Sequence, residues 1–338
     1  MLKAIILIIY PLIIFIINLF LTKKNIIPNY SGDDHQKFFE KDNIQLSGGI
    51  FLIPIFYIIS YEYSLILSFT IISIFLLGLF SDIGFFSSAK YRFLAQFIII
   101  FIFLFFSEIK LTSVRIELFD LMLNNNLFSL FFTLFCLMIL INGTNFIDGL
   151  NGLVLSYYLT IVLIVFKLGL FEYSFLNNLD VYIIMIVLIY LILFNLFNQL
   201  YIGDSGSYLI GFITGYFLIQ IYENGPLFSP YFIALLLWYP AFEILFSIIR
   251  KIKFKKSPFN PDNKHLHHLL FLCINKKYKL SNNFSNNLCS LIIILYNILI
   301  FYIATFNIYY TSLHISLFIF NIVVYLALYF KLSKTYFE

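Results

Sequence analysis

Long runs of apolar residues recur along the whole chain and constrain its fold more than any other feature. A helix that crosses the hydrocarbon core of a bilayer, about 30 Å thick, needs roughly 17 to 25 mainly apolar residues. Eleven segments meet or approach this requirement. They lie near residues 4–21, 48–61, 64–80, 91–107, 126–142, 150–169, 180–198, 206–221, 229–249, 288–306 and 312–330. We therefore predict an all-α, polytopic membrane protein with about 11 transmembrane helices.

The first two apolar segments have features that set them apart. Segment 4–21 has only Lys3 before it, no small-residue cleavage pattern after it, and Lys23 and Lys24 at its end. A cleaved signal peptide has the opposite charge order, so we expect a retained first span. Segment 48–61 is short and contains Pro54, which a membrane helix tolerates when neighbouring groups bond the freed carbonyl.

Composition excludes a water-soluble fold and a nucleic-acid surface. Charged residues make up 11% of the chain and the mean hydropathy is +0.96, whereas soluble domains carry about 25% charged residues. The formal charge of +4 comes from basic residues clustered at the ends of apolar segments, as in membrane proteins. The three cysteines have no metal-ligand or paired spacing, so we interpret them as structural.

Lysine and arginine residues predict the orientation of the spans. Alternate connections carry 17 basic residues on one side, against Lys3, Lys110 and Arg115 on the other, with Lys167 near a helix end. Because basic loops stay in the cytoplasm, the N-terminus is predicted outside and the C-terminus inside. The unusual polar sequences then fall in cytoplasmic loops near 22–47, 81–90, 142–150, 199–206 and 250–287. We infer one cytoplasmic site within a single transmembrane domain, 1–338.

The sequence Gly203-Asp204-Ser205-Gly206-Ser207 lies between two spans. Its glycines allow close approach of a ligand, and a helix N-terminus favours anions, so the segment suits a metal and a phosphate. Asp204 or Ser205 acting only as a helix cap is the alternative. A serine protease using Ser205 and His314 is disfavoured, because the predicted topology separates them by most of the membrane thickness.

Two further segments combine polar groups that suit substrate binding. Asn142, Asn145 and Asp148 recur at intervals of three, so they share a face if the helix persists, although capping explains part of the pattern. Segment 257–268 combines prolines, Lys264 and three histidines. Phosphate binding suits it better than zinc, because the histidine spacing and the single nearby Cys273 do not form a typical zinc site; a solvated loop is the remaining alternative. Asp82 at the end of a span is ambiguous, since it can cap the next helix.

Taken in order, these motifs resemble those of the polyprenyl-phosphate N-acetylhexosamine-1-phosphate transferases, which start lipid-linked cell-envelope glycans, from about residue 34 to residue 268. The histidine segment resembles the branch that initiates O-antigen and teichoic acid. The matching pieces are Gln36-Lys37-Phe38 with Ser47-Gly48-Gly49; Asp82 with Arg92 and Gln96; Asn142, Asn145, Asp148 and Gly149; Asn195 with Gly203-Asp204-Ser205-Gly206-Ser207; and Pro258-Phe259, Asp262 and His265-Leu266-His267-His268.

The resemblance implies transfer of N-acetylhexosamine 1-phosphate from a UDP-sugar to undecaprenyl phosphate, with release of UMP, at the cytoplasmic face of a bacterial inner membrane. It implies Mg²⁺, with Mn²⁺ as an alternative, and is compatible with a homodimer. Asp204 is the expected metal ligand, with Asp82 and Asp148 as further catalytic residues. The expected substrate-binding residues are Lys37, Asn142, Asn145, Asn195, His265, His267 and His268.

The chain departs from the family pattern at three positions. Ser81 and Asn151 stand where many members have acids, and Phe39 where a histidine is common. A general base is dispensable for this reaction, because a phosphate monoester with a second pKa near 6 is largely dianionic at pH 7. A transporter or a non-catalytic relative with the same pocket is the alternative function, because buried polar residues in membrane helices also mark substrate pathways.

Overall fold

The structure is a computed structural model that describes residues 2–24, 26–27, 44–260 and 264–337. Its elements are α1 (Leu2–Lys24), β1 (Gln45–Leu46), α2 (Gly48–Tyr63), α3 (Leu65–Asp82), α4 (Ala89–Ser107), α5 (Glu117–Leu123), α6 (Asn126–Ile147), α7 (Leu153–Lys167), η1 (Leu170–Tyr173), α8 (Asn178–Leu196), β2 (Leu200–Tyr201), α9 (Gly203–Asn224), α10 (Pro230–Leu236), α11 (Trp238–Lys253), α12 (Leu266–Tyr278), α13 (Asn282–Ala304) and α14 (Thr311–Phe337).

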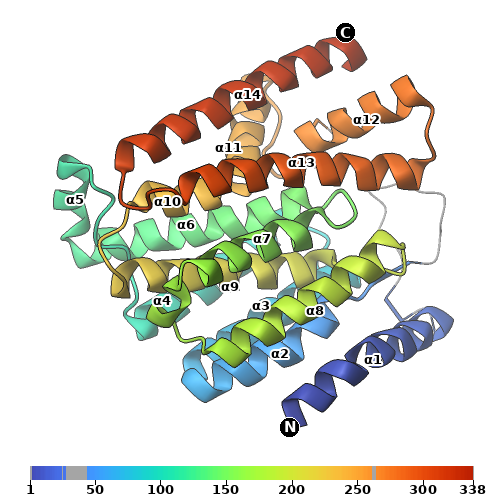
Figure 1. The fold of residues 1–338 in the computed structure, drawn as a ribbon, viewed down its shortest axis with the longest axis horizontal. Coiled ribbons are helices and arrows are strands. Elements are labelled where there is room, and N and C mark those ends of the chain that lie inside the picture. The colour runs from blue at the N-terminus through green and yellow to red at the C-terminus, as the bar shows by residue number, and fades with distance from the viewer. Residues whose placement is uncertain (1, 25, 28–43, 261–263, 338) are drawn as a thin grey trace.

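All eleven predicted apolar segments form helices, and most of the long helices run side by side (Figure 1). Within the described residues, six helices are long and apolar enough to cross a membrane, or seven if α10 and α11 form one bent span. The helices α2 and α7 are apolar but shorter. These findings confirm an all-α, multi-pass membrane protein, whereas the 11 spans and the orientation of the termini stay predictions.

Helix α9 forms the centre of the bundle. Its most extensive neighbours are α3 and α6, and α2 also packs along it. Nearly every residue from Ser205 to Ile221 is buried. A helix enclosed by other helices does not face lipid, which is why it carries the polar Thr214 and Gln220 among its apolar side chains.

The short strands β1 and β2 fix the start of α9 beside the start of α2. They pair in parallel, with Gln45 opposite Leu200 and Leu46 opposite Tyr201. The amide of Gly49 continues the contact by donating to the carbonyl of Ile202 at 3.3 Å. Two chain segments separated by more than 150 residues therefore enter the same end of the bundle together.

The predicted span 229–249 is interrupted. Its two parts, α10 and α11, meet at Leu237 with a bend of 74°. Pro240 lies in the first turn of α11 and has no amide hydrogen to donate to the carbonyl of Leu236, so α10 cannot continue through it.

The predicted loop boundaries need two corrections. The segment 142–150 is helical as far as Ile147, because α6 continues through Asn142 and Asn145 before the chain turns. The segment 250–287 contains the end of α11 and the whole of α12, whose buried residues include Leu269 and Phe271. Helix α12 packs against α13 and α14, so its apolar face is covered by protein.

Candidate active site

The first turn of α9 places Asp204 at the end of the bundle where α3 and α6 end. Gly203 immediately before it has φ of +71°, a conformation that residues with a side chain rarely adopt. A Cβ at this position would also lie 2.7 Å from Oδ2 of Asp82. Glycine is therefore required here on two independent grounds, and it allows α9 to begin directly against α3.

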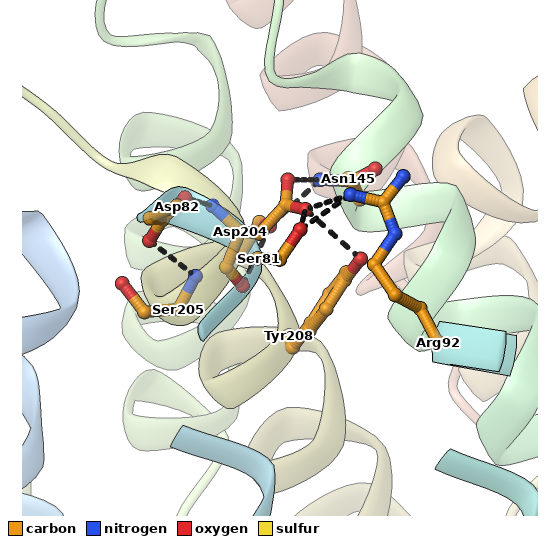
Figure 2. A network of polar contacts seen from close by, with 8 residues as sticks. Ser81, Asp82, Arg92, Asn145, Asp204, Ser205 and Tyr208 are labelled. Carbon is orange, nitrogen blue, oxygen red and sulfur yellow. Dashed lines mark hydrogen bonds and ion pairs between the residues drawn. The ribbon is translucent and has the colours of Figure 1, made fainter. Parts of the chain in front are cut away.

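The carboxylate of Asp204 accepts hydrogen bonds from four side chains, three on other helices and one a turn further along α9 (Figure 2). Oδ2 accepts from Ser81 Oγ at 2.5 Å, Arg92 Nη1 at 2.9 Å and Tyr208 Oη at 3.1 Å. Oδ1 accepts from Asn145 Nδ2 at 2.6 Å. All four partners donate, so both oxygens of Asp204 act as acceptors in this arrangement.

Asp82 lies on the opposite side of the same turn (Figure 2). Its Oδ1 accepts from the backbone amide of Asp204 at 2.7 Å, and its Oδ2 from the amide of Ser205 at 3.0 Å. Its side chain is buried. Asp82 therefore satisfies two of the free amides at the N-terminus of α9.

The polar stripe at the end of α6 persists as a helical face up to Asn145. Asn142 Nδ2 donates to Gln96 Oε1 at 2.8 Å, and Asn145 reaches Asp204 and also Ser207 Oγ at 3.2 Å. Asp148 follows as the C-cap residue of α6. The spacing of three thus directs the two asparagines toward α4 and α9, as expected for side chains on one face of a continuous helix.

Asp148 has an unusual protonation behaviour for an acid. Burial, together with the negative charge of Asp204, raises its pKa to about 8. Asp148 also interacts electrostatically with Tyr201 in β2: burial and the charge of Asp148 raise the pKa of the Tyr201 phenol to about 12. At neutral pH the folded protein therefore keeps Asp148 mainly protonated until a cation or a donor compensates its charge.

The three histidines of segment 257–268 pack against the end of α6. The rings of His267 and His268 lie 4.2 Å apart, and that of His265 lies 5.6 Å from each. A Cβ on Gly149 would lie 2.5 Å from Nε2 of His268 and 2.7 Å from Nε2 of His267. The absence of a side chain at Gly149 therefore lets both imidazoles approach the residue that follows Asp148.

Asn195 lies in a different environment from the other predicted substrate-binding residues. It is buried, its Oδ1 accepts from the amide of Gly152, and its Nδ2 donates to the carbonyl of Leu200 at 2.8 Å. Asn151 is also buried and donates to Asn198 Oδ1 at 2.6 Å. These amides connect the turn after α6 to the end of α8 and to β2, which is a scaffolding contact.

The sequence also drew attention to Lys37, Asp262 and His314. Lys37 and Asp262 lie outside the described residues. His314 lies at the opposite end of the bundle from Ser205: its Nε2 is 3.1 Å from the carbonyl oxygen of Ala304. Nearby Thr311 bonds Arg115, which also binds carbonyls just beyond the end of α9. The structure therefore separates the two residues of the disfavoured protease hypothesis.

Sequence reasoning missed Tyr208 and underestimated Ser81. Tyr208 is four residues after Asp204, a spacing that brings two side chains of one helix together, so the sequence did contain a signal. Ser81 entered only as the loss of an acid, although its hydroxyl contacts Asp204 directly. No local pattern indicates a contact between side chains 123 residues apart.

Fold and site together define a multi-pass helical membrane protein whose polar groups surround an aspartate at one end of the bundle. Residues 64–222, just under half of the chain, match the family described as Glycosyl transferase family 4. The match runs from the start of α3 to near the end of α9 and includes Ser81, Asp82, Arg92, Asn142, Asn145, Asp148, Asn195 and Asp204.

Curated relatives carry names that agree with the family. An undecaprenyl-phosphate alpha-N-acetylglucosaminyl 1-phosphate transferase of Thermotoga maritima is 29% identical over 138 residues, which are 40% of this chain and 41% of that protein. A probable undecaprenyl-phosphate N-acetylglucosaminyl 1-phosphate transferase of Bacillus subtilis is 32% identical over 137 residues, 38% of this chain and 37% of that protein. A decaprenyl-phosphate N-acetylglucosaminephosphotransferase of Mycolicibacterium smegmatis is 29% identical over 165 residues, 42% of this chain and 40% of that protein. The chain thus spans about two fifths of the length of the relatives that it matches.

Proposed function

We propose that the chain transfers N-acetylhexosamine 1-phosphate from a UDP-sugar to a polyprenyl phosphate, with undecaprenyl phosphate as the acceptor, and so starts a lipid-linked cell-envelope glycan. UDP-N-acetylglucosamine is the first donor to test, because the relatives named above are N-acetylglucosamine phosphotransferases. The observation that carries the proposal is the convergence of Ser81, Arg92 and Asn145 on Asp204 at one end of an apolar bundle. We further propose that this end faces the cytoplasm of a bacterial inner membrane.

The proposed reaction exchanges one phosphoanhydride bond for another. An oxygen of the polyprenyl phosphate forms a bond to the phosphorus that carries the sugar, and the bond from that phosphorus to the bridging oxygen of UMP breaks. Both reactants are anions, and two unit charges 4 Å apart repel by about 4 kcal/mol at an effective dielectric constant of 20. The site must therefore supply positive charge and oriented donors more than covalent chemistry.

The residues at Asp204 fit a magnesium ion of the kind that binds together with phosphate. Within the described residues, no three His, Cys, Asp or Glu side chains gather as ligands of one ion. Mg²⁺ typically needs only one or two carboxylates, with water and substrate phosphate as its other ligands. Asp204 would hold the ion, with Asp148 as the second acid nearby, and bound Mg²⁺ would neutralise charge on the diphosphate. Mn²⁺ offers the same chemistry.

The protein's own groups would bind and orient the two phosphates. Arg92 is the cation in direct contact with Asp204, and its guanidinium fits phosphate oxygens as well as carboxylates. The imidazoles of His265, His267 and His268 supply further donors beside Gly149. Asp82 would act by fixing the first turn of α9, since its oxygens both bind amides of that turn.

The test is release of UMP by the purified protein with undecaprenyl phosphate, Mg²⁺ and a panel of UDP-sugars. We expect release with UDP-N-acetylglucosamine that depends on both the lipid and the metal. Asp204→Asn should abolish it, whereas Glu172→Gln, at an exposed acid in η1, should not. Counter-flow of UDP-sugar into vesicles without UMP would instead favour transport, and no UMP with any donor would reject the proposed reaction.

A further inference from the structure

Glu243 is a buried acid on α11 that lies outside the region matched to the family. Its Oε1 lies 2.9 Å from Nδ1 of His265 and accepts from the amide of Leu266 at 3.4 Å. Its Oε2 accepts from the hydroxyl of Tyr325 on α14 at 2.8 Å. One carboxylate thus links α11 and α14 to the first histidine of the histidine segment.

The partners of Glu243 determine which ring nitrogen of His265 donates to the carboxylate. The amide of Leu266 and the hydroxyl of Tyr325 both donate to the carboxylate, so both of its oxygens act as acceptors. An accepting oxygen 2.9 Å away requires a hydrogen on the facing Nδ1 of His265. Nε2 is then the ring nitrogen left to contact a ligand, and it donates to an anionic oxygen when it also carries a hydrogen.

His265 itself is placed between this carboxylate and the candidate active site. Its ring is buried and packs edge-on against Phe146 near the end of α6, with centroids 5.3 Å apart. The ring of His267 stacks on it at 5.6 Å, and His267 in turn touches Gly149 beside Asp148. His265 therefore packs between the end of α6 and His267, which lies against Gly149.

The segment that precedes His265 is anchored from the same helix. Arg250, two turns after Glu243 on α11, donates to the carbonyl of Lys264 and to the hydroxyl of Tyr329 at 2.7 Å. Tyr325 and Tyr329 are one turn apart on α14. Helix α14 thus contacts both Glu243 and Arg250, whose partners are His265 and the residue before it. Burying the Glu243 carboxylate in this way has a desolvation cost.

We propose that Glu243 is a positioning residue for His265: it accepts the Nδ1 hydrogen of a ring that carries hydrogens on both nitrogens, so that Nε2–H donates to a phosphate oxygen of the nucleotide-sugar donor. Tyr325 fixes the carboxylate in turn. The inference rests on the proposed function, because the phosphate ligand does. If Glu243 positions His265, activity depends on both the charge and the length of the glutamate side chain. If Glu243 only fills space in the core, activity tolerates loss of the charge.

The kinetic test compares Glu243→Gln, Glu243→Asp and Tyr325→Phe with the wild type. We expect Glu243→Gln to lower kcat about 10- to 100-fold, the range seen when a partner that orients a functional histidine is removed. Glu243→Asp should recover part of the loss, and KM for undecaprenyl phosphate should stay within about threefold because His265 faces the donor. In the double variant with His265→Gln, the two losses should not multiply.

Matched controls separate positioning from folding. Tyr296→Phe removes a comparable hydrogen bond, to Asn321 at 2.6 Å, and Glu223→Gln alters an acid at the other end of the bundle. Both should retain wild-type kcat. Thermal denaturation identifies variants that fail to fold, and Tyr325→Phe, which keeps the ring and its packing, provides the milder test in that case.

Nitrogen-15 NMR of histidine-labelled protein supplies a readout that needs no turnover. The chain has five histidines, and His265→Gln assigns the signals of His265 by difference. We expect Nδ1 of His265 to be protonated in the wild type and this signature to change in Glu243→Gln but not in Glu223→Gln. If the wild type releases no UMP, the proposed function fails while the NMR result still tests the pair. Wild-type kinetics in an active Glu243→Gln, or an unprotonated Nδ1, would overturn the inference.

Discussion

The hydroxyl of Ser81 donates to Oδ2 of Asp204 at 2.5 Å, and Arg92 donates to both groups. By resemblance, Ser81 stands where many family members have an acid. A neutral residue there leaves Asp204 as the one negative charge facing Arg92 in this contact, with both side chains partly exposed. The ion pair therefore holds the Asp204 side chain in place, and a metal ion must compete with Arg92 for it.

Ser81→Asp should increase the effect of Mg²⁺ on stability. A second carboxylate about 4 Å from Asp204 would repel it by about 4 kcal/mol at an effective dielectric constant of 20, and Arg92 offsets only part of this. We expect Ser81→Asp to have a lower melting temperature without Mg²⁺ and a larger increase in melting temperature when Mg²⁺ is added. Half of that increase should occur at an about tenfold lower Mg²⁺ concentration. Ser81→Asn, equal in size but neutral, is the control. Identical Mg²⁺ titrations for the two variants would contradict a metal at Asp204.

The apolar pattern predicted the helices, because each transmembrane helix must satisfy its own backbone and cover itself with apolar side chains. It did not predict α12, since Leu266–Tyr278 is short and its apolar face, with Leu269 and Phe271, is recognisable only once α13 and α14 cover it. The 74° bend at Leu237 was also missed, although Pro240 was visible in the sequence.

Parts of the site followed from the sequence and others depended on the packing. The spacing of Asn142 and Asn145 indicated a shared face because helical periodicity is local. The roles of Asp82 and Asn195 were not decidable in this way, because their partners lie on α9 and on the turn after α6. Glu243 carried a signal that was overlooked: an acid inside an apolar segment marks a functional position by default.

Asn195→Ala should destabilise the fold without changing substrate affinity. The buried carboxamide bonds the amide of Gly152 and the carbonyl of Leu200, and leaving buried backbone groups unpaired costs about 1–3 kcal/mol. We expect a lower melting temperature with KM unchanged for both substrates. Asn145→Ala should show the reverse, a loss of activity with little loss of stability, since it faces Asp204. A raised KM in Asn195→Ala at wild-type stability would make Asn195 a binding residue after all.

The raised pKa of Asp148 predicts a pH dependence of stability in the protein without ligands. Its pKa is about 8 in the folded state and near 4 in an unfolded chain. The folded protein therefore binds the extra proton between these values, so this contribution is fully present below about pH 4 and is lost as pH rises through about 8. As pH rises from 5 to 9, the melting temperature of the wild type should fall relative to that of Asp148→Asn.

The same group predicts the opposite trend for metal binding and transfer. A cation favours ionised Asp148, so its binding releases a proton, and Mg²⁺ affinity should rise with pH up to about 8. Isothermal titration of Mg²⁺ in buffers of different ionisation enthalpy measures the proton released. Asp148→Asn should release less. Equal proton release by the variant and the wild type would show that Asp148 does not sense the metal.

Gly149→Ala tests whether the histidine segment must lie against the end of α6. A methyl group there would lie 2.5 Å from Nε2 of His268 and 2.7 Å from Nε2 of His267, so both rings must move. Because displacement of a binding group by about 1 Å can cost 10²-fold in rate, we expect kcat/KM for the UDP-sugar to fall about 10- to 100-fold. Gly215→Ala is the matched control, since its methyl group meets only the ends of Leu137 and Leu140, far from the histidines. A wild-type kcat/KM in Gly149→Ala, with Gly215→Ala also unchanged, would remove the histidine segment from the donor site and leave Asp204 and Arg92 as the groups that bind the diphosphate.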